Sequence, residues 1–363
     1  MEEKKTHKSA LSIQEGVYQP PSINPEVLSD RGKRKRKKYS VDEFVSGILS
    51  GNRAILSQAI TLIESSLPQH YDTSQAIIEK CLPSSGNSVR IGITGVPGVG
   101  KSTLIEALGL FIAGEGRKTA VLAVDPSSRQ TKGSILGDKT RMEKLSTHPD
   151  AFIRPSPAAG TLGGVARKTR ETIILCEAAG FDTILVETVG VGQSETAVHS
   201  MVDFFLLLML AGAGDELQGI KRGIMEMADL IAITKADGKN ESSAGGARIL
   251  YQNALHLFPA PASGWKPDVL TCSAVSNKGI RELWIKILEY VWFTRRSGYF
   301  EQRRKEQELI RMDDAILEYL KYTFLNNRRV KSLRPQIEKL LSEGKITSYR
   351  AAVSLIDNYL KES

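Results

Sequence analysis

One short segment restricts the possible folds of this 363-residue chain more than any other. Residues 95–102 read Gly-Val-Pro-Gly-Val-Gly-Lys-Ser, between an apolar run at 89–94 and a helix-length stretch that begins near Thr103. Glycines let the backbone curl so that successive N–H groups point inward, and the N-terminus of the following helix favours an anion. The lysine supplies positive charge to phosphates, and the serine hydroxyl can bind magnesium. The segment therefore predicts a phosphate-binding loop made of Gly95, Val96, Pro97, Gly98, Val99, Gly100, Lys101, Ser102 and Thr103.

Short apolar segments alternate with amphipathic ones after residue 88. The predicted strands span residues 89–94, 119–125, 182–187, 204–210, 229–234 and 268–272. The predicted helices between them span residues 103–113, 165–179, 244–257 and 278–290. Repeated βα units indicate an α/β fold with a doubly wound, mostly parallel sheet, which binds ligands at the carboxyl ends of its strands.

The rest of the chain divides by composition. Residues 1–39 are polar, end in a basic block, and are predicted to be a disordered arm. Residues 40–88 are predicted to form a helical subdomain that leads into a nucleotide-binding domain at 89–294, and its first residues resemble a capping box. Residues 295–363 are predicted to form a charged helical tail, with shorter helices near 336–342 and 348–361. This tail either packs back on the domain or extends as an arm that pairs with another subunit.

Charge and hydropathy exclude several functions. Residues 31–38 carry seven of the positive charges, so the net charge of +8 falls to +1 without them and the domain itself shows no basic face. Nucleic-acid binding is therefore not expected. The longest apolar run, residues 204–213, is about half of the ~20 residues that span a bilayer, and the N-terminus lacks an apolar signal segment. Three scattered cysteines fit neither a disulfide framework nor a zinc site, and we expect a cytoplasmic protein.

Three acidic residues are candidates for a metal site near the loop. Asp125 and Glu187 each end a predicted strand, and Asp138 lies in the loop between these strands. Magnesium prefers oxygen ligands and usually keeps several waters. We therefore expect Ser102 to bind the metal, with Asp125 and Glu187 bound directly or through water and Asp138 joining when its loop closes. A helix cap or a surface charge is the alternative for each acid.

The sequence Thr234-Lys235-Ala236-Asp237 follows another predicted strand and indicates which base is bound. An aspartate at this place accepts hydrogen bonds from the ring N–H and amino group of guanine, which adenine does not offer as a pair. The stem of Lys235 can lie along the base. After the next strand, Ser273 and Ala274 can present a backbone N–H to the guanine carbonyl. The pattern favours guanine over adenine.

Together these residues resemble the MeaB/ArgK family of P-loop GTPases (SIMIBI type) over about residues 41–360. The most specific stretches are Gly95–Thr103, Val124–Ser128, Ser134–Met142, Glu187–Glu195 and Thr234–Gly238. The resemblance implies a magnesium-dependent GTPase that chaperones an adenosylcobalamin-dependent acyl-CoA mutase of the methylmalonyl-CoA mutase type. GTP hydrolysis would gate cofactor loading and protect the mutase. It also implies a homodimer built with the C-terminal helices, and metal-site acids at Asp125, Asp138 and Glu187.

Two features depart from that pattern or lie outside it. Asn is the commoner residue where this chain has Thr234, and a hydroxyl offers less than an amide for bridging base and loop. The basic block at 31–38 lies outside the resemblance. An older family label, an ATPase or kinase that serves lysine, arginine and ornithine transport, is the alternative function.

The expected catalytic residues are Lys101, Asp138 and Glu187. Gln193 and Asp138 are the candidates for orienting the attacking water. Arg129, Arg141 and Arg154 lie in predicted loops, but none of them can be assigned as an arginine finger. Because phosphoryl transfer depends on positioned charge, we expect slow intrinsic hydrolysis that a partner accelerates.

Overall fold

The computed structural model describes residues 39–65, 67–124, 142–155, 162–188, 194–212 and 222–361. The chain divides into two units, Met1–Ser40 and Val41–Ser363, and every element named below belongs to the second. The strands are β1 (Val89–Gly95), β2 (Thr119–Val124), β3 (Ala151–Arg154), β4 (Thr183–Thr188), β5 (Phe204–Leu210), β6 (Leu230–Thr234) and β7 (Asp268–Thr271). The helices between or after them are α5 (Lys101–Gly114), α7 (Glu143–Thr147), α8 (Leu162–Ala178), α9 (Ser194–His199), α10 (Arg222–Met227), α11 (Glu241–Leu255) and α12 (Ile280–Arg296).

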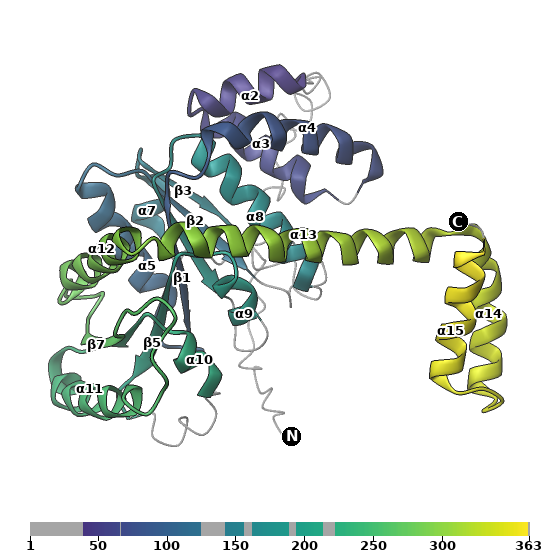
Figure 1. Ribbon diagram of the computed structural model, residues 1–363. Coiled ribbons are helices and arrows are strands. Elements are labelled where there is room, and N and C mark those ends of the chain that lie inside the picture. Colours follow the sequence, from purple (N-terminus) through teal and green to yellow (C-terminus); the bar gives the residue numbers. More distant parts are fainter. Residues whose placement is uncertain are drawn as a thin grey trace, which may run out of the picture. The chain divides into compact units, whose positions relative to one another are not determined.

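The strands named above form one parallel sheet in the order β3-β2-β4-β1-β5-β6-β7 (Figure 1). This sheet confirms the predicted α/β fold with its parallel, doubly wound topology. β1 lies at the centre, with Ile91 opposite Leu185 of β4 and opposite Phe204 of β5. No strand was predicted at the position of β3. The loop that follows β1 therefore lies at the middle of the carboxyl edge of the sheet.

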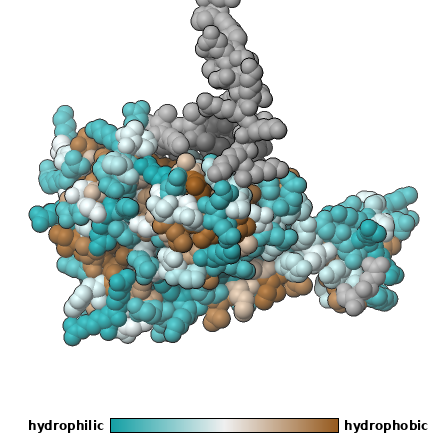
Figure 2. Space-filling model, turned by 90° about the horizontal axis from the view of Figure 1, so that it is seen from above, coloured by the Kyte–Doolittle hydropathy of each residue, from teal (hydrophilic) through white to brown (hydrophobic). Residues whose placement is uncertain are grey.

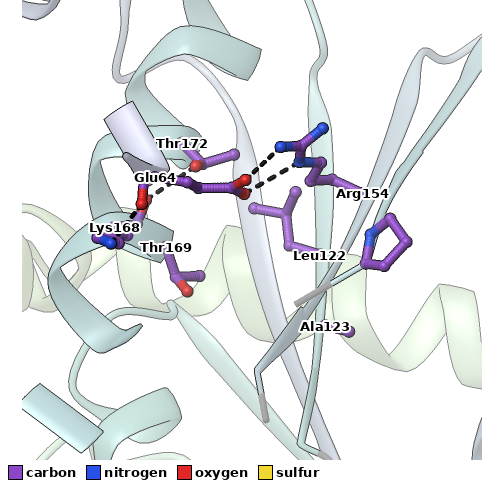
Figure 3. A pocket seen from close by; sticks show the side chains of 8 residues that line it. Glu64, Leu122, Ala123, Arg154, Lys168, Thr169 and Thr172 are labelled. Atoms are coloured by element: carbon purple, nitrogen blue, oxygen red, sulfur yellow. Dashed lines mark hydrogen bonds and ion pairs between the residues drawn. The ribbon is translucent and has the colours of Figure 1, made fainter. Parts of the chain in front are cut away.

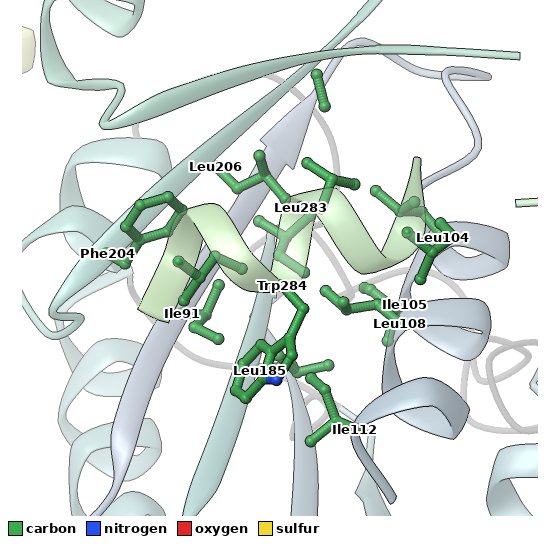
Figure 4. Close-up of a cluster of buried hydrophobic side chains, with 14 of the residues drawn as sticks. Ile91, Leu104, Ile105, Leu108, Ile112, Leu185, Phe204, Leu206, Leu283 and Trp284 are labelled. Carbon is green, nitrogen blue, oxygen red and sulfur yellow. The ribbon is translucent and has the colours of Figure 1, made fainter. Parts of the chain in front are cut away.

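The two faces of β1 pack against different elements. Ile91 and Ile93 point into a buried apolar cluster beneath α5 and α12, where Leu283 and Trp284 of α12 pack (Figure 4). Each large apolar side chain buried in this way contributes about 1.5–3 kcal/mol. Gly92 belongs to the opposite face, and a Cβ there would lie 2.9–3.0 Å from side chains of the α9 region and β5.

Among the described residues, three helices precede the sheet: α2 (Val41–Leu49), α3 (Arg53–Glu64) and α4 (Tyr71–Cys81), with 3-10 turns at η1 (Pro68–His70) and η2 (Leu82–Ser84). The side chain of Asn52 caps α3 by accepting hydrogen bonds from the N–H groups of Ala54 and Ile55. The buried stripe on α3 consists of Leu56, Ala59, Ile60 and Ile63. These helices pack on one another and on α8, so the predicted helical character of this region is confirmed.

The tail consists of α13 (Tyr299–Asn326), α14 (Arg328–Ser342) and α15 (Ser348–Leu360). α14 begins earlier than the expected helix at 336–342, because the Asn327 side chain caps it by accepting from two backbone N–H groups. The first turns of α13 pack on the domain, where Phe300, Arg303 and Gln307 are buried. Its later apolar residues, including Leu317, are exposed. The start of the tail thus packs on the domain, and pairing of the remainder with another subunit stays a prediction.

The surface of the described part carries exposed apolar side chains among charged ones (Figure 2). Many of them belong to the tail: Leu309, Ile310, Met312, Ile316, Leu317, Tyr319, Leu320, Tyr322, Leu325, Leu341, Tyr349, Ile356 and Leu360. Among the described residues, no helix combines the length and the hydropathy that crossing a membrane would require.

Candidate nucleotide-binding site

The loop between β1 and α5 has the conformation expected of a phosphate-binding loop. Gly95 has φ 154° and packs so closely on β5 that a Cβ would lie 2.6 Å from the carbonyl oxygen of Leu208. Gly100 has φ 95° and immediately precedes α5. Both positions require glycine, one because of a close approach and the other because of its left-handed backbone. The loop ends at the N-terminus of α5, which is favourable for an anion.

Lys101 binds the loop itself. Its Nζ donates to the carbonyl oxygen of Gly95 at 2.7 Å and approaches that of Val96 at 3.4 Å. Burial lowers the pKa of Lys101, while the negative charges of Glu187 and Glu195 act in the opposite direction. The hydrogen bonds from Lys101 to these neutral carbonyls can be exchanged for a stronger, charge-assisted bond to an anion.

Two oxygen ligands lie next to each other beside the loop. The Ser102 hydroxyl is 3.4 Å from Oε1 of Glu187, which is buried at the end of β4. The hydroxyl of Thr188 donates to that of Thr94 at 2.9 Å and ties the ends of β4 and β1 together. A serine hydroxyl and a carboxylate are suitable ligands for a hard divalent cation. Within the described ranges, no cluster of three or more His, Cys, Asp or Glu residues forms a metal site.

Several predicted residues lie outside the described residues. These are Asp125, Asp138, Gln193, Arg129 and Arg141. The structure therefore brings Ser102 and Glu187 together and leaves the other predicted metal and water-orienting residues as expectations.

The end of β6 holds the phosphate loop from the other side. Thr234, which is buried, donates its hydroxyl to the carbonyl oxygen of Val99 at 2.7 Å. Nζ of Lys235 donates to the carbonyl oxygen of Gly98 at 2.8 Å. A threonine in place of the commoner asparagine therefore keeps a direct contact with the loop. Thr234 and Lys235 join the predicted base-binding segment to the predicted phosphate-binding segment.

Asp237 and Ser273 are joined by a hydrogen bond. The Ser273 hydroxyl donates to the Asp237 carboxylate, and the backbone N–H of Ala236 donates to the carbonyl of Cys272 at 3.0 Å. Ala274 follows directly and is half-buried. The two predicted segments thus lie at neighbouring strand ends, with Asp237 after β6 and with Ser273 and Ala274 after β7.

Two residues at this site were missed by the sequence reasoning. Asn240 donates its side-chain N–H to the carbonyl of Lys235 at 2.7 Å and closes the turn after β6. Glu195 is buried at the start of α9, and its charge acts on Lys101. Glu195 is the last residue of the sequence stretch Glu187–Glu195. Its role near Lys101 follows from the burial of its carboxylate, which only the structure shows.

A small pocket with a cavity volume of about 10 Å³ lies elsewhere, between α3, α8 and the ends of β2 and β3 (Figure 3). Glu64 binds Arg154 there, and the Nζ of Lys168 donates to the Glu64 carbonyl. Arg154 is the last residue of β3, not part of a loop as expected, and its guanidinium is paired with Glu64. The pocket contains no residue of the loop at 95–103, so we distinguish it from the nucleotide site.

The parallel sheet, the loop at 95–102 and the strand ends around Asp237 define a P-loop GTPase. A family model described as methylmalonyl-CoA mutase-associated GTPase MeaB matches residues 56–328. The chain therefore belongs to the MeaB family of GTPases.

Individual proteins agree with this assignment. A probable GTPase of Mycobacterium tuberculosis is 48% identical over 324 residues, which cover 88% of this chain and 95% of that protein. The mitochondrial methylmalonic aciduria type A homolog of Mus musculus is 42% identical over 341 residues, 91% of this chain and 81% of that protein. A solved structure titled LAO/AO transport system kinase has a TM-score of 0.70 and 37% identity, and covers 89% of this chain and 99% of that chain.

Proposed function

We propose that this GTPase is magnesium-dependent and acts as a G-protein chaperone of an adenosylcobalamin-dependent acyl-CoA mutase of the methylmalonyl-CoA mutase type. The observation that carries the nucleotide site is the direct contact of Thr234 and Lys235 with the phosphate loop. Through it, one bound nucleotide would reach both the loop and the base-binding strand ends. The mutase partner is inferred from the family and the resemblance.

Lys101 and the loop amides would hold the phosphates. Lys101 would leave the carbonyl of Gly95 for the β- and γ-phosphates, because a charge-assisted contact is stronger than one to a neutral carbonyl. The residues proposed to line the nucleotide are Gly95–Thr103, Thr234, Lys235, Asp237, Ser273 and Ala274.

Ser102 and Glu187 would hold the magnesium ion. Their oxygens lie 3.4 Å apart, which suits two neighbouring ligands of one hard cation. Asp125 and Asp138 are proposed as further ligands on the strength of the resemblance. The metal would neutralise charge that develops on the phosphates, while Lys101, Asp138 and Glu187 serve as the catalytic residues.

Guanine specificity would come from Asp237. The Ser273 hydroxyl bound to this carboxylate fixes its orientation and leaves acceptor capacity for the ring N–H and amino group of guanine. Adenine would leave the carboxylate without these donors, which costs affinity. The same arrangement supports GTP rather than ATP as the substrate.

The partner and the oligomer are proposed together. The name of the matching family and the name of the murine relative both point to methylmalonyl-CoA metabolism. The exposed apolar side chains along α13, α14 and α15 supply a surface that a second copy of this chain can cover. We infer a homodimer whose GTP hydrolysis gates cofactor loading and protects the mutase.

A transport-associated kinase is the alternative function. The solved relative titled LAO/AO transport system kinase favours it. A kinase would transfer the γ-phosphate to a protein or small molecule, whereas the chaperone transfers it to water. The fate of the γ-phosphate therefore separates the two functions.

The test is GTP hydrolysis by the purified protein, alone and with the adenosylcobalamin-dependent mutase of the same organism, with ATP as the control nucleotide. We expect slow release of inorganic phosphate from GTP and a clear acceleration by the mutase. GTP preference without acceleration would remove the proposed partner. Preference for ATP, or transfer of phosphate to a transport component, would support the kinase instead.

A further inference from the structure

The strand that carries the phosphate loop packs directly on the end of α9. A Cβ at Gly92 would lie 2.9 Å from Val198 of α9 and 3.0 Å from Val202, which follows α9. Gly92 also lies opposite Phe205 of β5 in the parallel register. Interiors packed this closely transmit a displacement instead of absorbing it. A shift of β1 at the phosphate loop therefore has to move the segment around Val198–Val202, or be resisted by it.

The first turns of α13 form hydrogen bonds with the same segment. Gln307 donates its side-chain N–H to the carbonyl of Val202 at 2.8 Å. Nη2 of Arg303 lies 3.1 Å from Nε2 of His199, and also donates to the His199 carbonyl at 3.4 Å. Burial, together with the charge of Arg303, lowers the pKa of His199 to about 4, so the ring is neutral and can accept from the guanidinium. The carboxyl end of α9 is thus fixed to α13 by polar contacts.

A third element closes this arrangement. Arg170 of α8 donates to the hydroxyl of Ser200 at 2.9 Å and to Asp314 of α13 at 2.8 Å. One arginine therefore binds the turn after α9 and the middle of α13 at once. Beyond Asp314, apolar residues of α13 such as Leu317 and Tyr319 are exposed. The same helix is clamped to the α9 segment at one end and available to other surfaces at the other.

We propose that the segment from Val198 to Val202 couples the phosphate loop to α13, so that Gln307 and Arg303 act as positioning residues for nucleotide binding. A nucleotide that fixes the phosphate loop would stabilise the first turns of α13. By thermodynamic reciprocity, whatever holds α13 would change the affinity for the nucleotide by the same factor. This coupling rests on the proposed nucleotide site and needs no assumption about the mutase.

Gln307→Leu is the variant that tests the coupling, because it removes the donor to Val202 while keeping side-chain size. Gln302→Leu is its matched control, since Gln302 lies on the same helix, is exposed and donates only to Glu306 among the contacts of the described residues. GDP and a non-hydrolysable GTP analogue are titrated by calorimetry into the full-length protein and both variants. We expect Gln307→Leu to change the affinity for at least one nucleotide about fivefold or more. Gln302→Leu should bind like the parent protein.

Hydrogen exchange separates coupling from a purely structural role of Gln307, because a structural role would not make the protection of α13 depend on nucleotide. Bound nucleotide should slow the exchange of the backbone amides of residues 300–314 in the parent protein, and should slow it much less in Gln307→Leu. The amides of α14 serve as an internal reference. Arg303→Lys, which keeps the charge but shortens the side chain, replaces Gln307→Leu if that variant does not fold. Unchanged affinity and unchanged protection in the variants would overturn the proposal. Absence of any nucleotide binding by the parent protein would instead refute the nucleotide site itself.

Discussion

The two edges of the central sheet use their cations in different ways. At the carboxyl edge, Lys101 and Lys235 donate to backbone carbonyls of the phosphate loop. At the amino edge, Arg90 binds the carboxylate of Glu177 and Arg304 binds that of Asp203, all within buried or half-buried surroundings. Cations on neutral carbonyls can exchange for an anionic ligand, whereas cations on buried carboxylates are committed to structure. We therefore expect the cations at the carboxyl edge to serve ligand binding and those at the amino edge to stabilise the fold.

The largest expected effect is the loss of stability when a cation at the amino edge is removed. Burial alone would lower the pKa of Arg90, but the charge of Glu177 raises it overall, so the pair is ionised in the folded protein. Arg90→Met leaves the carboxylate of Glu177 buried without its counter-ion and should lower the free energy of unfolding by about 3–5 kcal/mol. Urea denaturation measures this loss.

The control for that variant is Arg334→Met. Arg334 pairs with Glu338 on the exposed face of α14, where an ion pair contributes less than about 1 kcal/mol. Equal destabilisation by the two variants would show that the amino-edge pair is no more important to folding than a surface pair.

The next effect concerns the carboxyl edge. Lys101→Ala removes the cation proposed to stabilise the phosphates during transfer, and should lower the GTP hydrolysis rate about 100-fold. Its stability should fall by no more than about 1 kcal/mol, because the hydrogen bonds that are lost go to neutral carbonyls and the burial of the charge opposes its attraction to Glu187 and Glu195. A large loss of stability with an unchanged hydrolysis rate would show that Lys101 serves the fold and not the phosphates, contrary to the proposed difference between the two edges.

A smaller effect is expected at Thr234. Thr234→Val keeps the shape of the side chain but leaves the carbonyl of Val99 without the hydroxyl that donates to it at 2.7 Å, which weakens the connection between the base-binding and phosphate-binding segments. We expect GDP and GTP to bind about tenfold more weakly, with guanine still preferred over adenine. Thr234→Ser, which restores a hydroxyl, serves as the control and should bind within a few-fold of the parent protein. Equal binding by all three would mean that this hydroxyl contributes nothing.

The smallest expected effect is a pH dependence at the amino edge. Because the pKa of His199 is lowered from 6.5 to about 4, the unfolded chain binds the proton first and stability falls as the pH drops from 6.5 towards 4. Burial raises the pKa of nearby Asp229 to about 6, and its stabilising contribution is lost as the pH rises through that value. The two groups, with Arg303 and Tyr290 against them, therefore oppose each other in this window.

His199→Asn separates these contributions. Asparagine keeps an acceptor for Arg303 and does not titrate. The variant should lose less stability than the parent protein between pH 6.5 and 4.5, by about 1 kcal/mol after allowance for partial solvent exposure. Thermal denaturation across this range measures the difference. Parallel profiles for variant and parent would show that His199 is protonated as easily in the folded protein as in the unfolded chain.

More of the contacts at the carboxyl edge than at the amino edge could be predicted from the sequence. The loop at 95–102 and the motif at 234–237 are local patterns, and parallel topology places the ends of their strands together. The contacts of Arg303 and Arg304 with α9 and Asp203 join residues about a hundred positions apart, and no local pattern marks them. The strand β3 was also missed, although the equally short β7 was predicted. Asp125 and Asp138 remain predictions from the sequence.

The central claim is that the strand ends at β6 and β7 and the phosphate loop form one guanine-nucleotide site. Its most direct test is a comparison of GDP, ADP and xanthosine diphosphate binding to the parent protein and to Asp237→Asn. We expect the parent protein to prefer GDP, and the variant to lose GDP while gaining xanthosine diphosphate, because an amide can donate to the carbonyl that replaces the amino group of guanine. Equal binding of ADP and GDP by the parent protein, or an unchanged preference in Asp237→Asn, would contradict the claim.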